Sequence, residues 1–262
     1  MAGGVVLLLK ACLNGSRRLG EHKAVPISPA QLAAEAEGAV RAGAAALHMH
    51  PRRPDGAETL DPAHCAAAID AIRTACPGVP LGLSTGLWIE GNPAGRRAAI
   101  SRWTVLPDFV SVNFSEPGTV DLCEMLLQRE IGIETGLWSA ADARAFLDSG
   151  LAPRCVRILL EPREEDVSRA VQTADAISAL LGPPGCGPRR LLHGEGPPAW
   201  GVLDAALARG YDIRIGFEDT LVLPDGRRAT SNADLVATAA ALARARGYEL
   251  MIPSLSPTGP TV

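Results

Sequence analysis

The chain has 262 residues, 47% of them apolar, and a formal net charge of −4. This length suits either two average domains or one α/β barrel of roughly 250 residues, with ample chain for a large core. The sequence contains no basic run and only 4% aromatic residues, so nothing in the composition indicates nucleic acid as a partner.

The first apolar run, residues 5–9, is too short to cross a bilayer and ends at Lys10. We therefore expect no membrane association. The cysteines form no C-x-x-C pair, which predicts reduced thiols in a cytoplasmic protein. They are Cys12, Cys65, Cys76, Cys123, Cys155 and Cys186.

Short apolar runs alternate with segments of helical spacing along the whole chain. The runs predict buried strands over Val5–Leu13, Ala45–His50, Pro80–Gly86, Asp108–Phe114, Gly132–Trp138, Arg154–Pro162, Arg189–Gly194 and Asp212–Asp219. The helical segments are Ser28–Ala42, Asp61–Ala75, Thr119–Glu130, Ala140–Leu147, Glu164–Leu181, Trp200–Arg209 and Ser231–Arg246. Glycines follow several of them, as expected for left-handed C-caps.

Strict alternation of strands and helices implies a parallel sheet, because each crossover must contain a helix. Closure into a (β/α)₈ TIM barrel is the economical arrangement for eight such units. The alternative is an open, doubly wound sheet. No linker or change of composition divides the chain, so we expect residues 1–262 to form a single α/β domain.

In such barrels the working residues lie at the carboxyl ends of the strands. Those ends are rich in polar residues here, and burying them without partners would cost kilocalories each. They comprise His48 and His50, Ser84-Thr85-Gly86, Ser111 and Asn113, Glu134-Thr135-Gly136, His193-Gly194-Glu195, and Glu218-Asp219.

The sharpest local pattern is His48-x-His50. Residues two apart on a strand face the same side, here the barrel interior, and two imidazoles converging there suit a metal ion. The alternative is a pair of histidines that only bond neighbouring carbonyl or carboxylate groups.

The last strand holds the second pattern, Arg214-x-Gly216-x-Glu218-Asp219. The same period of two places Arg214 and Glu218 on one face. Glu218 can then be a third metal ligand, which leaves open positions for substrate. Asp219 could act as a general base that Arg214 keeps ionised. The alternative is an ion pair that seals the barrel.

Further residues are candidates to contact substrate because they end strands or follow them directly. They are Asn14, Arg17, Ser84, Thr85, Gly86, Ser111, Asn113 and Glu134. Arg17 follows the first strand, where a guanidinium would favour a neutral or acidic substrate tail over an ammonium. His193 fits a pocket role and a structural role equally well.

Together these residues resemble the β-keto acid cleavage enzymes, the group that includes the 3-keto-5-aminohexanoate cleavage enzyme of lysine fermentation. The resemblance runs nearly end to end. It covers Leu13-Asn14-Gly15, Ile27-Ser28-Pro29, residues 42–52 around the H-x-H pair, Leu83-Ser84-Thr85-Gly86, Ser111-Val112-Asn113-Phe114, residues 213–219 and residues 231–236.

The resemblance implies a Zn²⁺-dependent barrel, commonly a homo-oligomer (dimer or tetramer). Such an enzyme converts a β-keto acid and acetyl-CoA into acetoacetate and a new acyl-CoA, by a retro-Claisen route and without a covalent nucleophile. It assigns the metal to His48, His50 and Glu218, and the base and its modulator to Asp219 and Arg214. Ser84, Ser111 and Asn113 would hold the substrate.

Two positions depart from the members that act on the amino-bearing acid. Those members carry acidic residues near the position of Arg17 and at the position of Gly136. Losing both carboxylates and gaining Arg17 argues for a neutral or anionic substrate tail.

Three other functions fit the sequence less well. A metal-dependent hydrolase of the amidohydrolase type requires its H-x-H pair on the first strand, whereas His48 and His50 end the second predicted strand. A Schiff-base aldolase needs an interior lysine, and Lys10 lies early on the first strand. A non-catalytic ligand-binding barrel would have no use for a base at Asp219.

Overall fold

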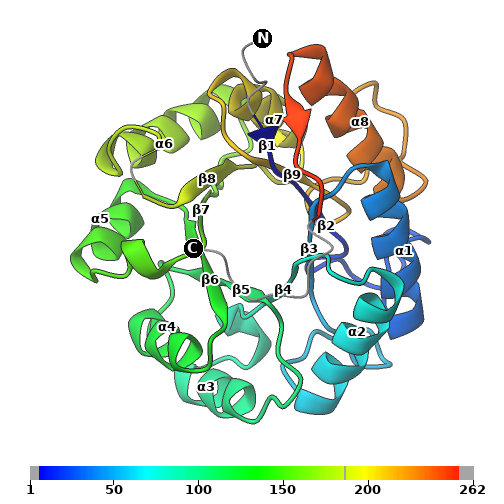
Figure 1. Cartoon of the computed structure of the whole chain (residues 1–262), viewed down its shortest axis with the longest axis vertical. Helices are drawn as coiled ribbons and strands as arrows, with labels where there is room; N and C mark the ends of the chain where they lie inside the picture. Colours follow the sequence, from blue (N-terminus) through cyan, green and yellow to red (C-terminus); the bar gives the residue numbers. More distant parts are fainter. Residues whose placement is uncertain (1–5, 186, 254–262) are drawn as a thin grey trace.

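Eight parallel strands form a ring at the centre of the molecule, with helices outside it (Figure 1). The computed structural model describes residues 6–185 and 187–253, so Val5 and Cys186 lie outside the described residues. The ring runs in the order β8-β7-β6-β5-β4-β3-β2-β9. Its strands are β2 (Leu9–Cys12), β3 (Ala46–Met49), β4 (Leu81–Ser84), β5 (Phe109–Asn113), β6 (Gly132–Leu137), β7 (Arg157–Leu160), β8 (Arg189–Leu192) and β9 (Ile213–Ile215).

The ring closes between β8 and β9 through a narrow seam. One parallel bridge joins Leu191 to Asp212. The amide of Leu192 donates to the carbonyl of Asp212 at 3.1 Å, and the amide of Asp212 donates to the carbonyl of Arg190 at 2.9 Å. The predicted (β/α)₈ barrel is therefore confirmed, and the open doubly wound sheet is excluded.

The outer layer consists of helices that follow the strands in sequence. They are α1 (Pro29–Ala42), α2 (Pro62–Ala75), α3 (Pro93–Ser101), α4 (Thr119–Gln128), α5 (Ala140–Asp148), α6 (Val167–Leu180), α7 (Ala199–Ala208) and α8 (Asn232–Ala245). Ser28, Asp61, Ser139 and Ser231 cap four of them by accepting from backbone amides. The predicted glycine C-caps Gly43, Gly150, Gly182, Gly210 and Gly247 all have positive φ.

Helix α3 was absent from the sequence prediction although its start is well marked. Asn92 caps it by accepting from the amide of Gly95 at 2.7 Å, and Pro93 follows in the first turn. The helix spans only Pro93–Ser101 and has low mean hydropathy. The segment is only nine residues long and Ile100 is its single large apolar residue, so it offers few positions for the pattern on which the prediction depended.

The predicted first strand divides into two pieces. Val6–Leu7 (β1) pairs with Glu249–Leu250 (β10) in a separate two-stranded sheet, and β2 joins the barrel. Between them the amide of Leu8 donates to a carboxylate oxygen of Asp212 at 2.9 Å. Burial is continuous from Leu7 to Leu13, so hydropathy alone gives no sign of the break.

The barrel interior below the strand ends contains a buried ionic cluster. Lys10 of β2, Glu134 of β6 and Arg157 of β7 form direct ion pairs around the two oxygens of Glu134. Lys10 and Glu134 have no exposed surface. None of the helices that the structure describes is long and apolar enough to cross a membrane.

Candidate metal centre and active site

A cavity of about 260 Å³ opens at the carboxyl ends of the strands. Polar groups from almost every strand line it, between the two tryptophans Trp88 and Trp138. The lining residues are Ser16, His48, His50, Ser84, Trp88, Ser111, Asn113, Trp138, Glu161, Arg163, His193, Glu195, Arg214 and Glu218.

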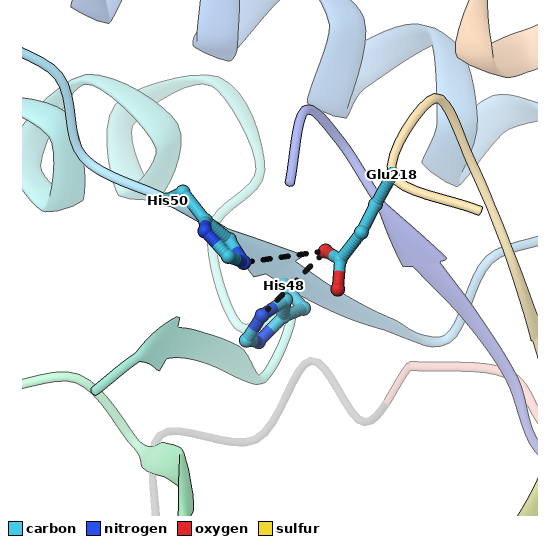
Figure 2. Close-up of side chains that lie close together, drawn as sticks. All are labelled: His48, His50 and Glu218. Carbon is cyan, nitrogen blue, oxygen red and sulfur yellow. Dashed lines mark ion pairs between the residues drawn. The ribbon is translucent and has the colours of Figure 1, made fainter. Parts of the chain in front are cut away.

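His48, His50 and Glu218 point toward one another in this cavity (Figure 2). Oε2 of Glu218 lies 3.7 Å from Nε2 of His48 and 3.5 Å from Nε2 of His50. One ligand atom from each residue lies within 4.8 Å of the others. An ion bound at about 2.0–2.1 Å from each atom requires separations of this order.

The protonation states also fit a metal ligand set. Burial lowers the pKa of His48 well below its usual value, which leaves its imidazole neutral. Burial alone would raise the pKa of Glu218, but Arg214 and the two histidines lower it well below the usual range. Among the described residues, Oε2 of Glu218 and Nδ1 of His48 are buried without a hydrogen-bond partner. Imidazole and carboxylate groups together are a common donor set for Zn²⁺.

Glu218 and Asp219 lie in a turn, and here the structure corrects the sequence prediction. Strand β9 ends at Ile215, and the amides of Asp219 and Thr220 donate to the carbonyl of Gly216. A strand would place Glu218 and Asp219 on opposite faces. The turn instead brings both to Arg214, whose Nη2 donates to Glu218 at 2.7 Å and to Asp219 at 2.8 Å.

The loop after β2 supports this turn. Gly15 has φ +53°, and a Cβ atom there would lie 2.8 Å from Cβ of Glu218. Arg17 donates from Nε to the carbonyl of Phe217 at 2.8 Å and from Nη2 to that of Glu218 at 3.1 Å. Arg17 thus holds the backbone that carries Glu218. It lines a second cavity, and Arg163 is the guanidinium that lines both cavities. This placement gives no support to the predicted contact between Arg17 and the substrate tail.

Of the predicted substrate residues, Ser84, Ser111 and Asn113 line the cavity. Asn113 donates from Nδ2 to Glu116 at 2.9 Å, which fixes its amide. All three come from the ends of neighbouring strands, β4 and β5.

The other predicted substrate residues lie behind the wall. Asn14 donates to the carbonyl of His50 and accepts from its amide, both at 2.9 Å. Thr85 donates from its hydroxyl to the carbonyl of Ser111 at 2.7 Å, and Gly86 packs against the ring of Trp88. Glu134 belongs to the buried ionic cluster and does not line the cavity. Asn14 therefore positions the backbone of His50, and Glu134 forms ion pairs with Lys10 and Arg157 inside the barrel.

Sequence reasoning missed Glu161, which directly follows β7. Its Oε1 lies 2.8 Å from Nε2 of His193, and its Oε2 accepts from Nε1 of Trp138 at 3.0 Å. Although burial alone would raise it, His193, Arg214 and Trp138 lower the pKa of Glu161 to about 2. The sequence did contain a sign of its importance, because Glu161 is a charged residue at the end of an apolar strand.

Sequence reasoning also missed Glu58, in the loop after β3. Its Oε1 lies 2.5 Å from Nδ1 of His50, and its Oε2 accepts from Nε1 of Trp88 at 3.1 Å. Burial lowers the pKa of His50, but Glu218 and Glu58 outweigh it and raise that pKa to about 9. No spacing relates a loop residue to a strand residue, so only the structure could find this contact.

The family model of the beta-keto acid cleavage enzymes matches residues 7–155 and 166–255, almost the whole described chain. The chain belongs to this family. A 3-keto-5-aminohexanoate cleavage enzyme of Fusobacterium nucleatum is 26% identical over 94% of each chain. A 3-oxoadipate:acetyl-CoA acetyltransferase of Cupriavidus necator is 23% identical and covers 92% of this chain and 89% of its own.

Solved structures of other proteins share the fold of this family member. The complex of ObcA with oxaloacetate superposes with a TM-score of 0.68 at 19% identity, over 88% of this chain and 66% of that one. A type I 3-dehydroquinate dehydratase from Clostridium difficile gives a TM-score of 0.60 at 11% identity, over 93% of this chain and 95% of that one. At these identities the likeness shows the barrel alone.

Proposed function

We propose that the protein is a Zn²⁺-dependent acyltransferase that exchanges acyl groups between a β-keto acid and acetyl-CoA, giving acetoacetate and a new acyl-CoA. One observation carries the proposal: His48, His50 and Glu218 converge beside a carboxylate, Asp219, that Arg214 holds in place. The names of the relatives, which describe β-keto acid cleavage and acetyl transfer from acetyl-CoA, support it.

His48, His50 and Glu218 would hold the metal, with a coordination position left for substrate. When bound, Zn²⁺ supplies a Lewis acid that favours negative charge on the keto oxygen. Ser84, Ser111 and Asn113 offer hydroxyl and amide groups along the same wall, where they can orient the substrate carboxylate. The rings of Trp88 and Trp138 also line the cavity and add apolar surface to it.

Asp219 is the group that moves a proton. Its Oδ1 accepts twice from Arg214, whereas its Oδ2 is buried and, among the described residues, has no partner. The free oxygen takes the proton from the carbon between the keto and carboxyl groups of the substrate. The two hydrogen bonds from Arg214 hold the carboxylate of Asp219 in place for this transfer.

The acyl exchange then balances without a covalent enzyme intermediate. The substrate carbon forms a bond to the thioester carbonyl of acetyl-CoA, and CoA thiolate leaves. The thiolate attacks the original keto carbon, and the bond between that carbon and its neighbour breaks. Acyl-CoA departs, and Asp219 returns its proton to the carbon of acetoacetate.

The metal assignment is tested by zinc analysis of protein purified without chelator. We expect about one Zn²⁺ per chain in the native protein and a large loss in His48→Ala. His64 lies on α2 beside Asp61, outside the cavity, so His64→Ala is the matched control and should keep its zinc. Full zinc occupancy in His48→Ala would disprove the ligand set.

The catalytic assignment is tested with a panel of β-keto acids and acetyl-CoA, scored for acetoacetate. Asp219→Asn should keep the fold and the zinc but lose about 10²–10⁴-fold in turnover, the usual effect of removing a general base. Turnover close to native in this variant would place the base elsewhere. A native protein with no activity on any member of the panel would refute the function itself.

A further inference from the structure

The pair formed by Glu161 and His193 has no role in the reaction as described above. Both side chains line the cavity and are almost fully buried, at 8% and 4% exposure. Glu161 holds Nε2 of His193 at 2.8 Å, and Trp138 in turn holds the second oxygen of Glu161 at 3.0 Å. The imidazole is therefore fixed on one side by two further residues.

The other ring nitrogen faces the proposed base. Nδ1 of His193 lies 3.4 Å from Oδ1 of Asp219. That same oxygen accepts from Nε of Arg214 at 3.1 Å and from Nη2 at 2.8 Å. Two nitrogen atoms of Arg214 thus donate to Oδ1 and Nδ1 of His193 lies within ion-pair distance of it, whereas Oδ2 has no partner among the described residues.

We propose that His193 and Glu161 are positioning residues that, together with Arg214, fix the carboxylate of Asp219 so that Oδ2 receives the substrate proton. The terminal torsion of an aspartate is broad, so either oxygen could otherwise turn toward the substrate. Because the hydrogen bonds from Arg214 and the ion-pair contact with His193 both engage Oδ1, Oδ2 is the oxygen left to receive the proton. This inference rests on the proposed function, because it assumes that Asp219 is the base.

Glu161 also contributes to the charge balance around Arg214. Proton uptake makes Asp219 neutral and removes one of the negative charges around Arg214. Glu161 remains 3.8 Å from Nη1 of Arg214 and in contact with His193. Because those partners hold its pKa near 2, Glu161 stays ionised and offsets the buried cations.

Proton removal can be measured apart from acyl transfer. In D₂O without acetyl-CoA, the native enzyme should accelerate deuterium incorporation at the carbon between the keto and carboxyl groups. We expect His193→Ala and Glu161→Gln to slow this exchange by about 10²-fold, the effect of misplacing a reacting group. Zinc content should not change. His64→Ala, which removes a histidine paired with Asp61 on α2, should match the native rate.

Added imidazole provides a readout that a purely structural role would not change. His193→Ala keeps Glu161, so imidazole should bind in the vacated space and restore exchange. It should not restore exchange in His193→Ala/Glu161→Gln. The native enzyme with imidazole controls for inhibition at the metal. If His193→Ala does not fold, Glu161→Gln alone tests the same contact.

The outcomes separate the two proposals. If exchange in the native enzyme does not depend on Asp219, the proposed function fails. If exchange depends on Asp219 but is native in His193→Ala, only the positioning role fails. Loss of zinc from His193→Ala, or a decrease in exchange that imidazole leaves unchanged, would also overturn the positioning role.

Discussion

Glu58 is a single side chain that joins the candidate metal centre to the wall of the cavity. One of its oxygens holds Nδ1 of His50, which directs Nε2 of the ring toward Glu218. The other oxygen holds the indole of Trp88, whose ring lies 6.4 Å from that of His50. Carboxylates behind metal-binding histidines orient the ring and increase its basicity.

We therefore expect Glu58→Gln to weaken zinc binding by about 10–100-fold, measured by competition with a chromophoric chelator. Fluorescence of Trp88 should also change, because its indole loses a charged acceptor. Asp55→Asn is the matched control, since Asp55 lies in the same loop and accepts from the backbone amide of Ala57. An unchanged zinc affinity in Glu58→Gln would show that His50 is oriented without it.

At the scale of elements, the sequence predicted the convergence of His48, His50 and Glu218, but it predicted the contacts of the surrounding loops poorly. His48 and His50 follow directly from strand periodicity, which the structure confirms on β3 and just beyond it. Arg17 and Asn14 were misinterpreted because a loop side chain can turn to backbone as easily as to substrate. Their hydrogen bonds go to residues far along the chain, at Phe217 and His50, which no local pattern encodes.

The loop after β2 yields a prediction about Gly15. Gly15→Ala adds a Cβ atom that meets Glu218 and must adopt φ +53°, so we expect reduced zinc content and a free energy of unfolding lower by about 1–3 kcal/mol. Gly20 has φ +89° with open space around it, so Gly20→Ala incurs only the backbone strain. Zinc analysis and denaturation of both variants separate the two effects. Equal zinc in both would mean that Glu218 tolerates the contact.

At the scale of the molecule, the alternation of apolar runs was enough to predict the barrel. The prediction required only that each strand segment be short and apolar and that a helical segment separate it from the next one. The ionic cluster below the cavity was not predicted. Lys10, Glu134 and Arg157 come from three strands, and their contacts depend on which strands become neighbours across the ring.

This cluster predicts a stability effect. Lys10→Met should lower the free energy of unfolding by about 3–5 kcal/mol, because it leaves the charge of Glu134 buried with fewer partners. The double variant Lys10→Met/Glu134→Gln should lose less than the sum of the single variants, since the two groups interact directly. Urea denaturation of all four proteins measures this coupling. Simple additivity would mean that the pair contributes nothing jointly.

The narrow seam between β8 and β9 divides the candidate site into two groups of different rigidity. Continuous ladders join β9 to β2 and β2 to β3, so His48, His50 and the turn bearing Glu218 belong to one hydrogen-bonded body. His193 stands across the seam, where one bridge replaces a ladder. Local opening there, with loss of the hydrogen bond from the amide of Gly196 to the carbonyl of Asp219, would separate His193 from Asp219 and leave His48, His50 and Glu218 together. The ring can thus open beside Asp219 while the three side chains of the candidate metal centre keep their arrangement.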